Sequence, residues 1–451
     1  MKQLIKLFVL IIIVLNSISC IKPDNKTDAL KNQILPMRER SEVRNKLLKD
    51  RFVSVLPQIM KRNNIDMWVI IAREYNEDPV IRTMLPATWL NARRRTILVV
   101  SDPGNNKPLE TYAIARYDVG EVFRKSWDPE KQPNQYRALA DLITDKNPKK
   151  IGINKSEYFA QADGLTAIEN DLFLKSLPNK YKNRVVSAEK VAIGWLETRS
   201  SMEMELYPNI CNIAHKIIKE GFSSNVIEPG VTTTDDLVWW FRERIRELKL
   251  VTWFHPSVDI QRNDNNKFDF LSSFSKAKPD NVIIPGDLLH VDFGITYLGL
   301  NTDTQQLAYV LKENEVKAPK EIRDALSIGN KLQDILTDEF VTGRTGNEIL
   351  LNALKKAKAA GIKPQIYTHP IGYYGHGSGP TIGMWDKQEG VPVNGDYPLY
   401  PNTAYSIELN AKVYIESWGK ELAIMLEEDA FFDGNKCQYI DPRQTEMIII
   451  K

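Results

Sequence analysis

The stretch Leu288-Leu-His-Val-Asp-Phe-Gly294 decides the fold of this chain, together with the residues that lead from it to a second aspartate. It is an apolar run that follows the turn residues Pro285 and Gly286, and this pattern predicts a buried strand. Asp292 lies in the run, and Asp303 follows eleven residues later, between a polar turn and a second apolar run. A hairpin would bring the two carboxylates together. Two adjacent buried anions are costly unless cations pair with them. An Asp pair at this spacing also occurs by chance in many chains, so the pair by itself does not predict a metal site.

Three further ionisable residues, His369, Glu408 and Glu427, complete an ordered series with the two aspartates. Four carboxylates and one imidazole form a hard, oxygen-rich ligand set. Such a set suits Mn, Fe(II), Co or Zn better than the metals that prefer thiolates. The negative charge is sufficient for two divalent ions.

The order Asp, Asp, His, Glu, Glu, with its eleven-residue Asp spacing, resembles the family of creatinase, aminopeptidase P, prolidase and methionine aminopeptidase. The segment His369-Pro-Ile-Gly-Tyr-Tyr-Gly-His376 is similar to the family motif His-x-x-Gly-x-x-x-His, in which the first His binds metal and the second faces the substrate. Tyr405-Ser-Ile-Glu408 and the segment 424–432 resemble the strands that carry the last two ligands. The resemblance covers about residues 196–451 and, more loosely, about 40–195.

The resemblance implies an α/β N-terminal domain followed by an α+β catalytic domain with the pita-bread fold. It implies a metallopeptidase that cleaves peptide bonds, in particular Xaa-Pro bonds at the N-terminus of a peptide, through a water molecule between two metal ions. Manganese is the preferred metal, with Co, Zn or Fe as alternatives. Catalytic roles fall to Glu408, which is placed to take a proton from the water, and to His376. The implied metal ligands are Asp292, Asp303, His369, Glu408 and Glu427.

Two assignments stay open at the level of the sequence. Gly375-His376-Gly-Ser-Gly379 also resembles the Gly-His-Gly-x-Gly of methionine aminopeptidases, in which that His is the ligand. In that register the second family His falls on Gly383, so we favour His369 as ligand and His376 as the catalytic residue. Glu428 competes with Glu427. Strand alternation allows only one of them to face the metals, and the apolar flanks favour Glu427.

The chain departs from the family pattern at two positions. A substrate-binding His is expected seventeen residues before Asp292, at Ser275, and no His lies within several residues of it. An Arg usually follows the second Asp, and Gln305-Gln306 stand there instead. These departures keep two alternatives open: a non-peptidase hydrolase or lyase of the same fold, or an inactive surface binding protein. His290 is two residues before Asp292, so both side chains point to the same face of the strand. His290 is therefore either a partner of the metal site or a core residue.

The length of 451 residues exceeds one ordinary core and predicts two domains, at 37–195 and 196–451. A formal net charge of +2 without a basic cluster argues against a nucleic-acid partner. The family resemblance implies proline-containing peptides as the partners, in the role of substrates. By analogy with the family, the N-terminal domain is also expected to support a homodimer.

The N-terminus predicts export. A start with two lysines precedes nine apolar residues at 7–15. Nine residues are too few to span about 30 Å of hydrocarbon, so the segment fits a signal peptide over 1–19. Cys20 follows small residues, as in a bacterial lipobox, and is predicted to carry lipid, with 20–36 as a tether. We therefore expect a lipid-anchored protein of a bacterial cell envelope, periplasmic or outer-membrane, whose lipid is its only membrane contact. A plain cleaved signal with an incidental Cys is the alternative.

Overall fold

The computed structural model describes residues 28–264 and 281–451 in two units, Met1–Leu35 and Pro36–Lys451. In the first unit the described residues contain one short 3-10 helix, η1 (Lys31–Gln33). The predicted signal peptide, Cys20 and the first part of the tether lie outside the described residues. Within the described ranges, no helix is both long and apolar enough to cross a membrane.

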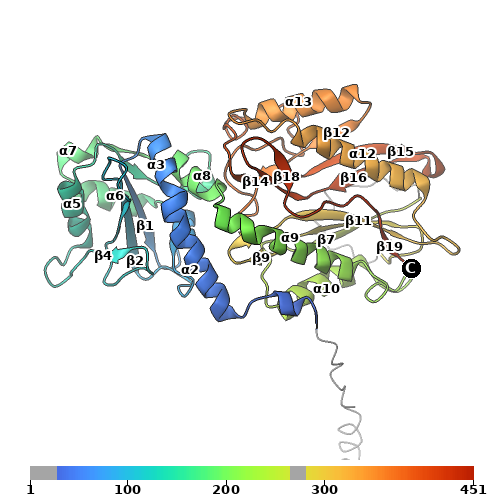
Figure 1. The fold of residues 1–451 in the computed structure, drawn as a ribbon, viewed down its shortest axis with the longest axis horizontal. Helices are drawn as coiled ribbons and strands as arrows, with labels where there is room; N and C mark the ends of the chain where they lie inside the picture. Colours follow the sequence, from blue (N-terminus) through green and yellow to red (C-terminus); the bar gives the residue numbers. More distant parts are fainter. Residues whose placement is uncertain (1–27, 265–280) are drawn as a thin grey trace, which may run out of the picture. The chain divides into compact units, whose positions relative to one another are not determined.

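The N-terminal part of the second unit is built around one mixed sheet, shown at the blue and cyan end of the ribbon in Figure 1. Its central strand pairs antiparallel with one neighbour and parallel with the other. In order across the sheet, the strands are β4 (Arg124–Lys125), β3 (Glu110–Ala113), β2 (Arg95–Ser101), β1 (Met67–Arg73), β5 (Ile151–Ile153) and β6 (Val185–Ser187).

Helices cover both faces of this sheet. In β1, Trp68 and Ile70 join the core on one face, while Val69 and Ile71 join the core on the other. This alternation follows from the two-residue period of a strand. The elements around the sheet are α2 (Met37–Ser54), α3 (Leu56–Asn63), α4 (Pro79–Met84), α5 (Gln135–Lys146), η2 (Ala160–Ala162), α6 (Ala167–Ser176), α7 (Asn179–Lys182) and α8 (Glu189–Glu197).

Capping boxes start three helices of the C-terminal part. Ser200 and Glu203 cap α9 (Ser201–Gly221), and Thr345 and Glu348 cap α13 (Gly346–Ala359). Helix α10 (Thr234–Glu247) starts in a run of three threonines at 232–234. The cap is Thr233, because the carboxylate of Asp236 accepts its backbone N–H at 2.9 Å.

Two layers of strands fill the centre of the C-terminal part, with a helix pair outside each layer (Figure 1). Helices α9 and α10 pack on the first sheet, and α12 (Lys320–Thr337) and α13 pack on the second. The first sheet has the order β19 (Ile448–Ile450), β11 (Thr304–Val310), β8 (Leu288–Phe293) and β7 (Ser257–Gln261). The second has the order β12 (Lys363–Ile366), β15 (Leu409–Ile415) and β16 (Lys420–Leu426).

A third sheet and a short ribbon complete the C-terminal part. The strands of this sheet are β13 (His369–Pro370), β14 (Thr403–Ser406), β17 (Asp429–Phe432) and β18 (Cys437–Tyr439). The ribbon pairs β9 (Thr296–Tyr297) with β10 (Leu300–Asn301), and a 3-10 turn, η3 (Glu416–Trp418), joins β15 to β16. The sequence shows no internal repeat, yet the helix–sheet arrangement occurs twice.

The hairpin expected between the two aspartates is present. Strands β8 and β11 are antiparallel, with Thr304 opposite Phe293 and Gln305 opposite Asp292. The β9–β10 ribbon lies between them in the chain. Asp292 and Asp303 therefore lie at the same end of one strand pair.

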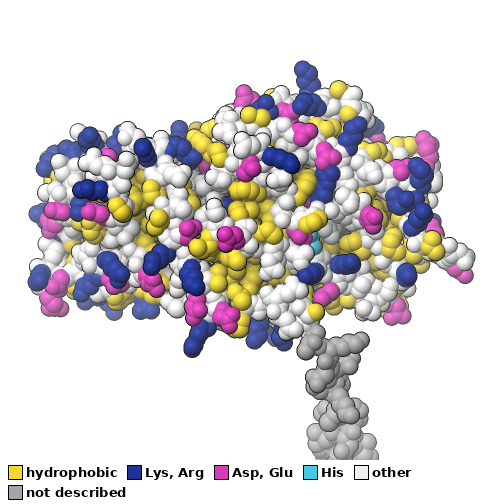
Figure 2. All heavy atoms as spheres, in the orientation of Figure 1, with side chains coloured by type: hydrophobic (Ala, Val, Ile, Leu, Met, Phe, Trp, Pro, Cys, Tyr) yellow, Lys and Arg dark blue, Asp and Glu magenta, His cyan; other side chains and the backbone are white. Residues whose placement is uncertain are grey.

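The face shown in Figure 2 gives little indication of function. On the face shown in Figure 2, Lys and Arg side chains are interspersed with Asp and Glu side chains. Charges of mixed sign create no extended field of one sign on that face. The informative charges are those that the fold brings together in its interior.

Candidate metal centre

The five residues expected to bind metal lie together in the structure. His369, Glu408 and Glu427 form one group, and Asp292 and Asp303 form a second group with the same Glu427. In each group, one ligand atom per residue lies within 4.8 Å of the others. Glu427 belongs to both groups, and its side chain is only 1% exposed. This arrangement is the one expected for two neighbouring ions that share a carboxylate.

The ligand candidates come from the ends of strands in all three sheets. Asp292 lies in β8, and Asp303 directly precedes β11. His369 opens β13, opposite Ser406 of β14. The two glutamates occupy breaks between strands: Glu408 joins β14 to β15, and Glu427 follows β16. Residues more than a hundred positions apart in the sequence meet because the sheets converge here.

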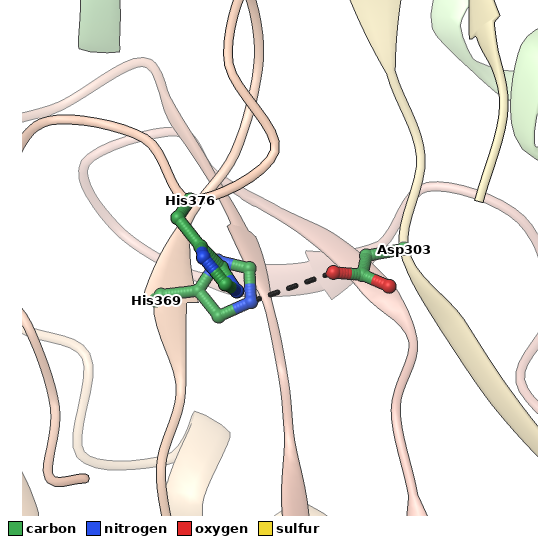
Figure 3. A group of neighbouring side chains, drawn as sticks. All are labelled: Asp303, His369 and His376. Atoms are coloured by element: carbon green, nitrogen blue, oxygen red, sulfur yellow. Dashed lines mark ion pairs between the residues drawn. The ribbon is translucent and has the colours of Figure 1, made fainter. Parts of the chain in front are cut away.

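The ring of His369 is held in the form that binds a metal. Its Nδ1 lies 3.1 Å from the backbone oxygen of Pro370, which can only accept a hydrogen bond. In the neutral ring the proton is therefore on Nδ1, and Nε2 keeps its lone pair. Nε2 has no hydrogen-bond partner and faces Asp303 Oδ2 at 3.6 Å (Figure 3) and Glu427 Oε1 at 3.4 Å. A backbone carbonyl that fixes the tautomer is typical of metal-binding histidines.

The buried carboxylates of the site have too little positive charge near them to balance their own negative charge. Burial, and next the charge of Glu427, raise the pKa of Asp292 and of Asp303 well above the usual range for an aspartate. The same two causes raise the pKa of Glu408. Oδ1 of Asp292 is buried without a hydrogen-bond partner.

His369 responds to the same charges. Burial lowers the pKa of its ring, but the nearby carboxylate of Glu427 and the charge of Glu408 raise it to about 9 overall. The site thus attracts positive charge, because its carboxylates favour a proton on the ring of His369. The unpartnered oxygen and nitrogen atoms and the oxygen-rich donor set fit divalent metal ions.

His376 lies at the exposed edge of the site, and it forms a third group of possible ligand atoms with Asp303 and His369. Its ring centroid is 4.8 Å from that of His369, with the planes nearly perpendicular at 86°, and Figure 3 shows both rings on the same side of Asp303. Trp253 packs against the other side of the ring at 5.2 Å. Partial desolvation and the neighbouring His369 lower the pKa of His376 to about 4. A neutral imidazole at this edge can donate one hydrogen bond and accept another.

Glu428 faces away from this centre. Its carboxylate contacts His215 Nε2 at 2.7 Å, accepts the Gln306 amide at 3.2 Å and accepts the backbone N–H of Gln444 at 2.9 Å. Consecutive residues of an extended segment point to opposite sides, so Glu427 and Glu428 take different surroundings.

Three site residues were not identified from the sequence: Gln305, Ser406 and Asp429. The amide of Gln305 donates to Glu408 at 2.6 Å and to Glu427 at 2.8 Å. The hydroxyl of Ser406 donates to Glu427 at 2.6 Å, and Asp429 accepts the backbone N–H of Asp303 at 3.3 Å. Each lies two positions from a ligand candidate on an extended segment. Side chains at this spacing point to the same side of a strand, and this pattern could have identified the three residues from the sequence.

Of the two positions at which the sequence departs from the family pattern, the structure describes one. Ser275, where a His was expected, lies outside the described residues. Gln306 is described, and it binds Glu428 on the side away from the metal-ligand candidates.

Comparisons with known proteins were made against families, curated proteins and solved structures. Residues 205–432 match the model of metallopeptidase family M24. No curated protein matched the sequence. An X-Pro aminopeptidase from Thermotoga maritima is 17% identical with a TM-score of 0.60, over 86% of this chain and 99% of that one. An Xaa-Pro dipeptidase from Bacillus anthracis is 16% identical with a TM-score of 0.55, over 92% of this chain and 100% of that one.

A further similar structure is not described as a peptidase. The N-terminal domain of the FACT complex subunit SPT16 from chickpea is 12% identical with a TM-score of 0.53, over 92% of this chain and 99% of that one. At such identities these likenesses establish the fold alone. They confirm the expected α/β N-terminal part followed by a pita-bread domain.

Proposed function

The chain belongs to metallopeptidase family M24, and on this basis we propose that it is a hydrolase with two divalent metal ions that cleaves Xaa-Pro bonds at the N-terminus of peptides. The observation that carries the proposal is the cluster of four carboxylates, three of which lie within 3.9 Å of the free Nε2 of His369. The similar Xaa-Pro aminopeptidase and dipeptidase structures favour proline-containing substrates. An Xaa-Pro bond suits a specialised site because its nitrogen carries no hydrogen for a peptidase to bind.

The proposed ligands are Asp292, Asp303, His369, Glu408 and Glu427. Hard oxygen donors with a single imidazole favour manganese, with Co, Zn or Fe as alternatives. When bound, two divalent ions lower the pKa of a water molecule and polarise a peptide carbonyl.

The chain's own residues supply the remaining steps. Glu408 reaches solvent more than Glu427 does, with 16% of its side chain exposed against 1%, so it is placed to take a proton from the attacking water. His376 is neutral near pH 7 because its pKa is lowered to about 4, and its N–H donates to the oxygen that becomes negative as the carbonyl is attacked. We propose these two as the catalytic residues.

The test is a panel of peptides hydrolysed by the protein reconstituted with Mn(II). It compares Xaa-Pro dipeptides, longer peptides with proline at the second position, and matched peptides with alanine in place of proline. We expect release of the N-terminal residue from the proline peptides only. Equal rates on the alanine peptides would exclude the Xaa-Pro assignment, and the two proline groups distinguish a dipeptidase from an aminopeptidase.

A surface binding protein without activity is the second candidate. It is favoured by the absence of the expected Arg, at whose place Gln305 and Gln306 stand. The similarity to the SPT16 domain, which is not described as a peptidase, is also compatible with it. Metal content separates the two functions, because a protein without activity has no need to gather this much uncompensated charge. Elemental analysis after reconstitution that finds no Mn, Co or Zn would favour the binding protein.

We also propose that the protein is anchored in a bacterial cell envelope by lipid on Cys20, and that it acts as a homodimer. Both rest on the sequence: the first on the basic and apolar start that ends in Cys20, the second on family analogy. Light scattering coupled to gel filtration measures the mass directly, and a monomer of about 50 kDa would exclude the dimer.

A further inference from the structure

Three buried polar residues lie in a row across the sheet that carries Asp292. Asp259 of β7 is directly opposite His290 of β8, and Gln305 lies diagonally from His290 on β11. The exposed fractions of Asp259, His290 and Gln305 are 4%, 2% and 1%. Buried polar side chains are costly unless hydrogen bonds satisfy them, so a row of three requires an explanation.

The hydrogen bonds of this row have a definite direction. Nε2 of His290 donates to Oε1 of Gln305 at 2.9 Å, since the ring is the only donor of the pair at that contact. The oxygen of the Gln305 amide is therefore turned toward His290, and its NH2 group is turned toward the metal-ligand candidates. The two hydrogens of that NH2 group go to two different carboxylates, Glu408 Oε1 at 2.6 Å and Glu427 Oε2 at 2.8 Å.

The oxygens that Gln305 leaves free are those that face the centre of the site. Glu408 Oε2 lies 3.9 Å from the free Nε2 of His369, and Glu427 Oε1 lies 3.4 Å from it. The two glutamates stand on different chain segments and repel each other, and the amide holds one oxygen of each. With one oxygen held by Gln305, the second oxygen of each carboxylate is directed toward the position of the ions, and that of Glu427 also accepts the Ser406 hydroxyl at 2.6 Å.

We propose that Gln305 is a positioning residue that holds Glu408 and Glu427 in the orientation that binds the two ions, and that His290 fixes the direction of its amide. The inference rests on the proposed metal site and adds to it a role for residues that do not touch the ions. It also gives a function to Gln305, one of the two residues at which the chain departs from the family pattern.

The first experiment compares Gln305→Met with a matched control, Gln306→Met. Both replacements are of similar length and remove a buried amide from the same strand, but the Gln306 amide binds Glu428 at 3.2 Å rather than the two ligand candidates. The metal-free proteins are titrated with Mn(II) in a calorimeter, and circular dichroism checks the fold. Partners that orient metal ligands typically contribute about 10–100-fold to affinity, and we expect a loss of this size for Gln305→Met. We expect little change for Gln306→Met.

The second experiment tests the role of His290 by a double-mutant cycle on the same Mn(II) affinity. His290→Leu frees the amide to rotate, so we expect it to weaken binding when Gln305 is present. In the Gln305→Met background the same change should have no further effect, because there is no amide left to orient. A general packing role of His290 would instead give equal losses in both backgrounds. If Gln305→Met does not fold, Gln305→Leu, which also removes the amide, replaces it in both experiments.

The outcomes separate this inference from the proposed function. Wild-type protein that binds Mn(II) together with a Gln305→Met variant of equal affinity would overturn the positioning role alone. Wild-type protein that binds none of Mn(II), Co(II) and Zn(II) would overturn the metal site and the inference with it. Equal losses for Gln305→Met and Gln306→Met would also contradict the inference, since they would indicate general disturbance of β11.

Discussion

At the scale of the residue, the two histidines of the site differ in what surrounds each ring. His369 is 8% exposed, gives its Nδ1 proton to a carbonyl and turns a free Nε2 toward carboxylates. His376 is exposed and packs edge-on against Trp253 and His369. The first environment attracts a cation, and the second keeps a neutral ring beside the place where a substrate would bind.

This difference gives a prediction for alanine variants. His369→Ala should weaken metal binding itself, while His376→Ala should retain metal and lose turnover. Acid–base and oxyanion roles contribute roughly 10²–10⁴-fold in rate, so the loss at His376 should be large and mainly in kcat. Calorimetry and steady-state kinetics measure the two effects. The reverse pattern, with metal lost only in His376→Ala, would favour the Gly-His-Gly register.

A second residue-scale prediction concerns Asp303. Its carboxylate lies in the group with Asp292 and Glu427 and also faces Nε2 of His369 at 3.6 Å. Asp303→Ala should therefore abolish tight binding of at least one of two ions. Elemental analysis after reconstitution gives the stoichiometry. Two tightly bound ions in the variant would contradict the assignment.

At the scale of the element, the segment that carries His376 is held by the N-terminal part of the same unit. Nε2 of Gln161 donates to the backbone oxygen of His376 at 2.9 Å, and Oε1 of Gln161 accepts the hydroxyl of Ser378 at 3.2 Å. Tyr374 adds a bond from its hydroxyl to the backbone oxygen of Pro79 at 2.7 Å. The N-terminal part thus fixes the position of a proposed catalytic residue.

We predict that Gln161→Ala lowers kcat and leaves Mn(II) affinity unchanged, because it frees the chain around His376 without touching a ligand candidate. A shift of about 1 Å in a catalytic group can cost about 10²-fold in rate, so a loss of about tenfold is expected for one lost support. Gln58→Ala, an exposed helical glutamine, is the control. Unchanged kcat in Gln161→Ala would show that the segment holds its position unaided.

At the scale of the whole molecule, α9 is tied to the C-terminal segment through a charged cluster. His215 of α9 contacts Glu428 at 2.7 Å through Nε2 and Asp441 at 2.7 Å through Nδ1. Burial lowers the pKa of this ring, but the two carboxylates more than offset that effect and raise it to about 10. The ordinary value of 6.5 applies to the unfolded chain, so the folded state holds an extra proton between the two values.

The sign of the pH dependence follows. The stabilisation by His215 is fully present below pH 6.5 and is lost as the pH rises toward about 10. We predict that the free energy of unfolding of the metal-free protein, measured with a denaturant, falls by a few kcal/mol over this pH window. The reason is that folding shifts the pKa of His215 by more than one unit. His215→Gln should reduce this fall and leave only the part due to His369, whose pKa is also raised, while His255→Gln, at an exposed His bonded to Arg242, should keep all of it. An unchanged slope in His215→Gln would contradict the prediction.

The anchoring proposal also belongs to the whole molecule. Cys20→Ser should release the protein from the membrane fraction and leave peptidase activity unchanged, because the site is built by residues from 292 onward. Fractionation of broken cells measures the first effect. Wild-type protein found in the soluble fraction would identify the segment as a plain cleaved signal.

The sequence by itself indicated the fold class, through its resemblance to a family, and the hairpin that joins Asp292 to Asp303. The hairpin rests on local signals, namely apolar runs and turn residues, which act within a few residues of each other. The ordered series of five ionisable residues indicated the family, which residues 205–432 confirm.

Only the tertiary structure decided which groups surround the five ligand candidates. The direction of the Gln305 amide depends on His290 of a neighbouring strand, and its targets lie 103 and 122 residues away in the chain. Which of Glu427 and Glu428 faces the other ligand candidates also depends on the tertiary structure, because His215 of α9 contacts Glu428. Such contacts depend on how sheets and helices converge, and no local pattern encodes them, because side chains distant in sequence meet only after the strands have paired.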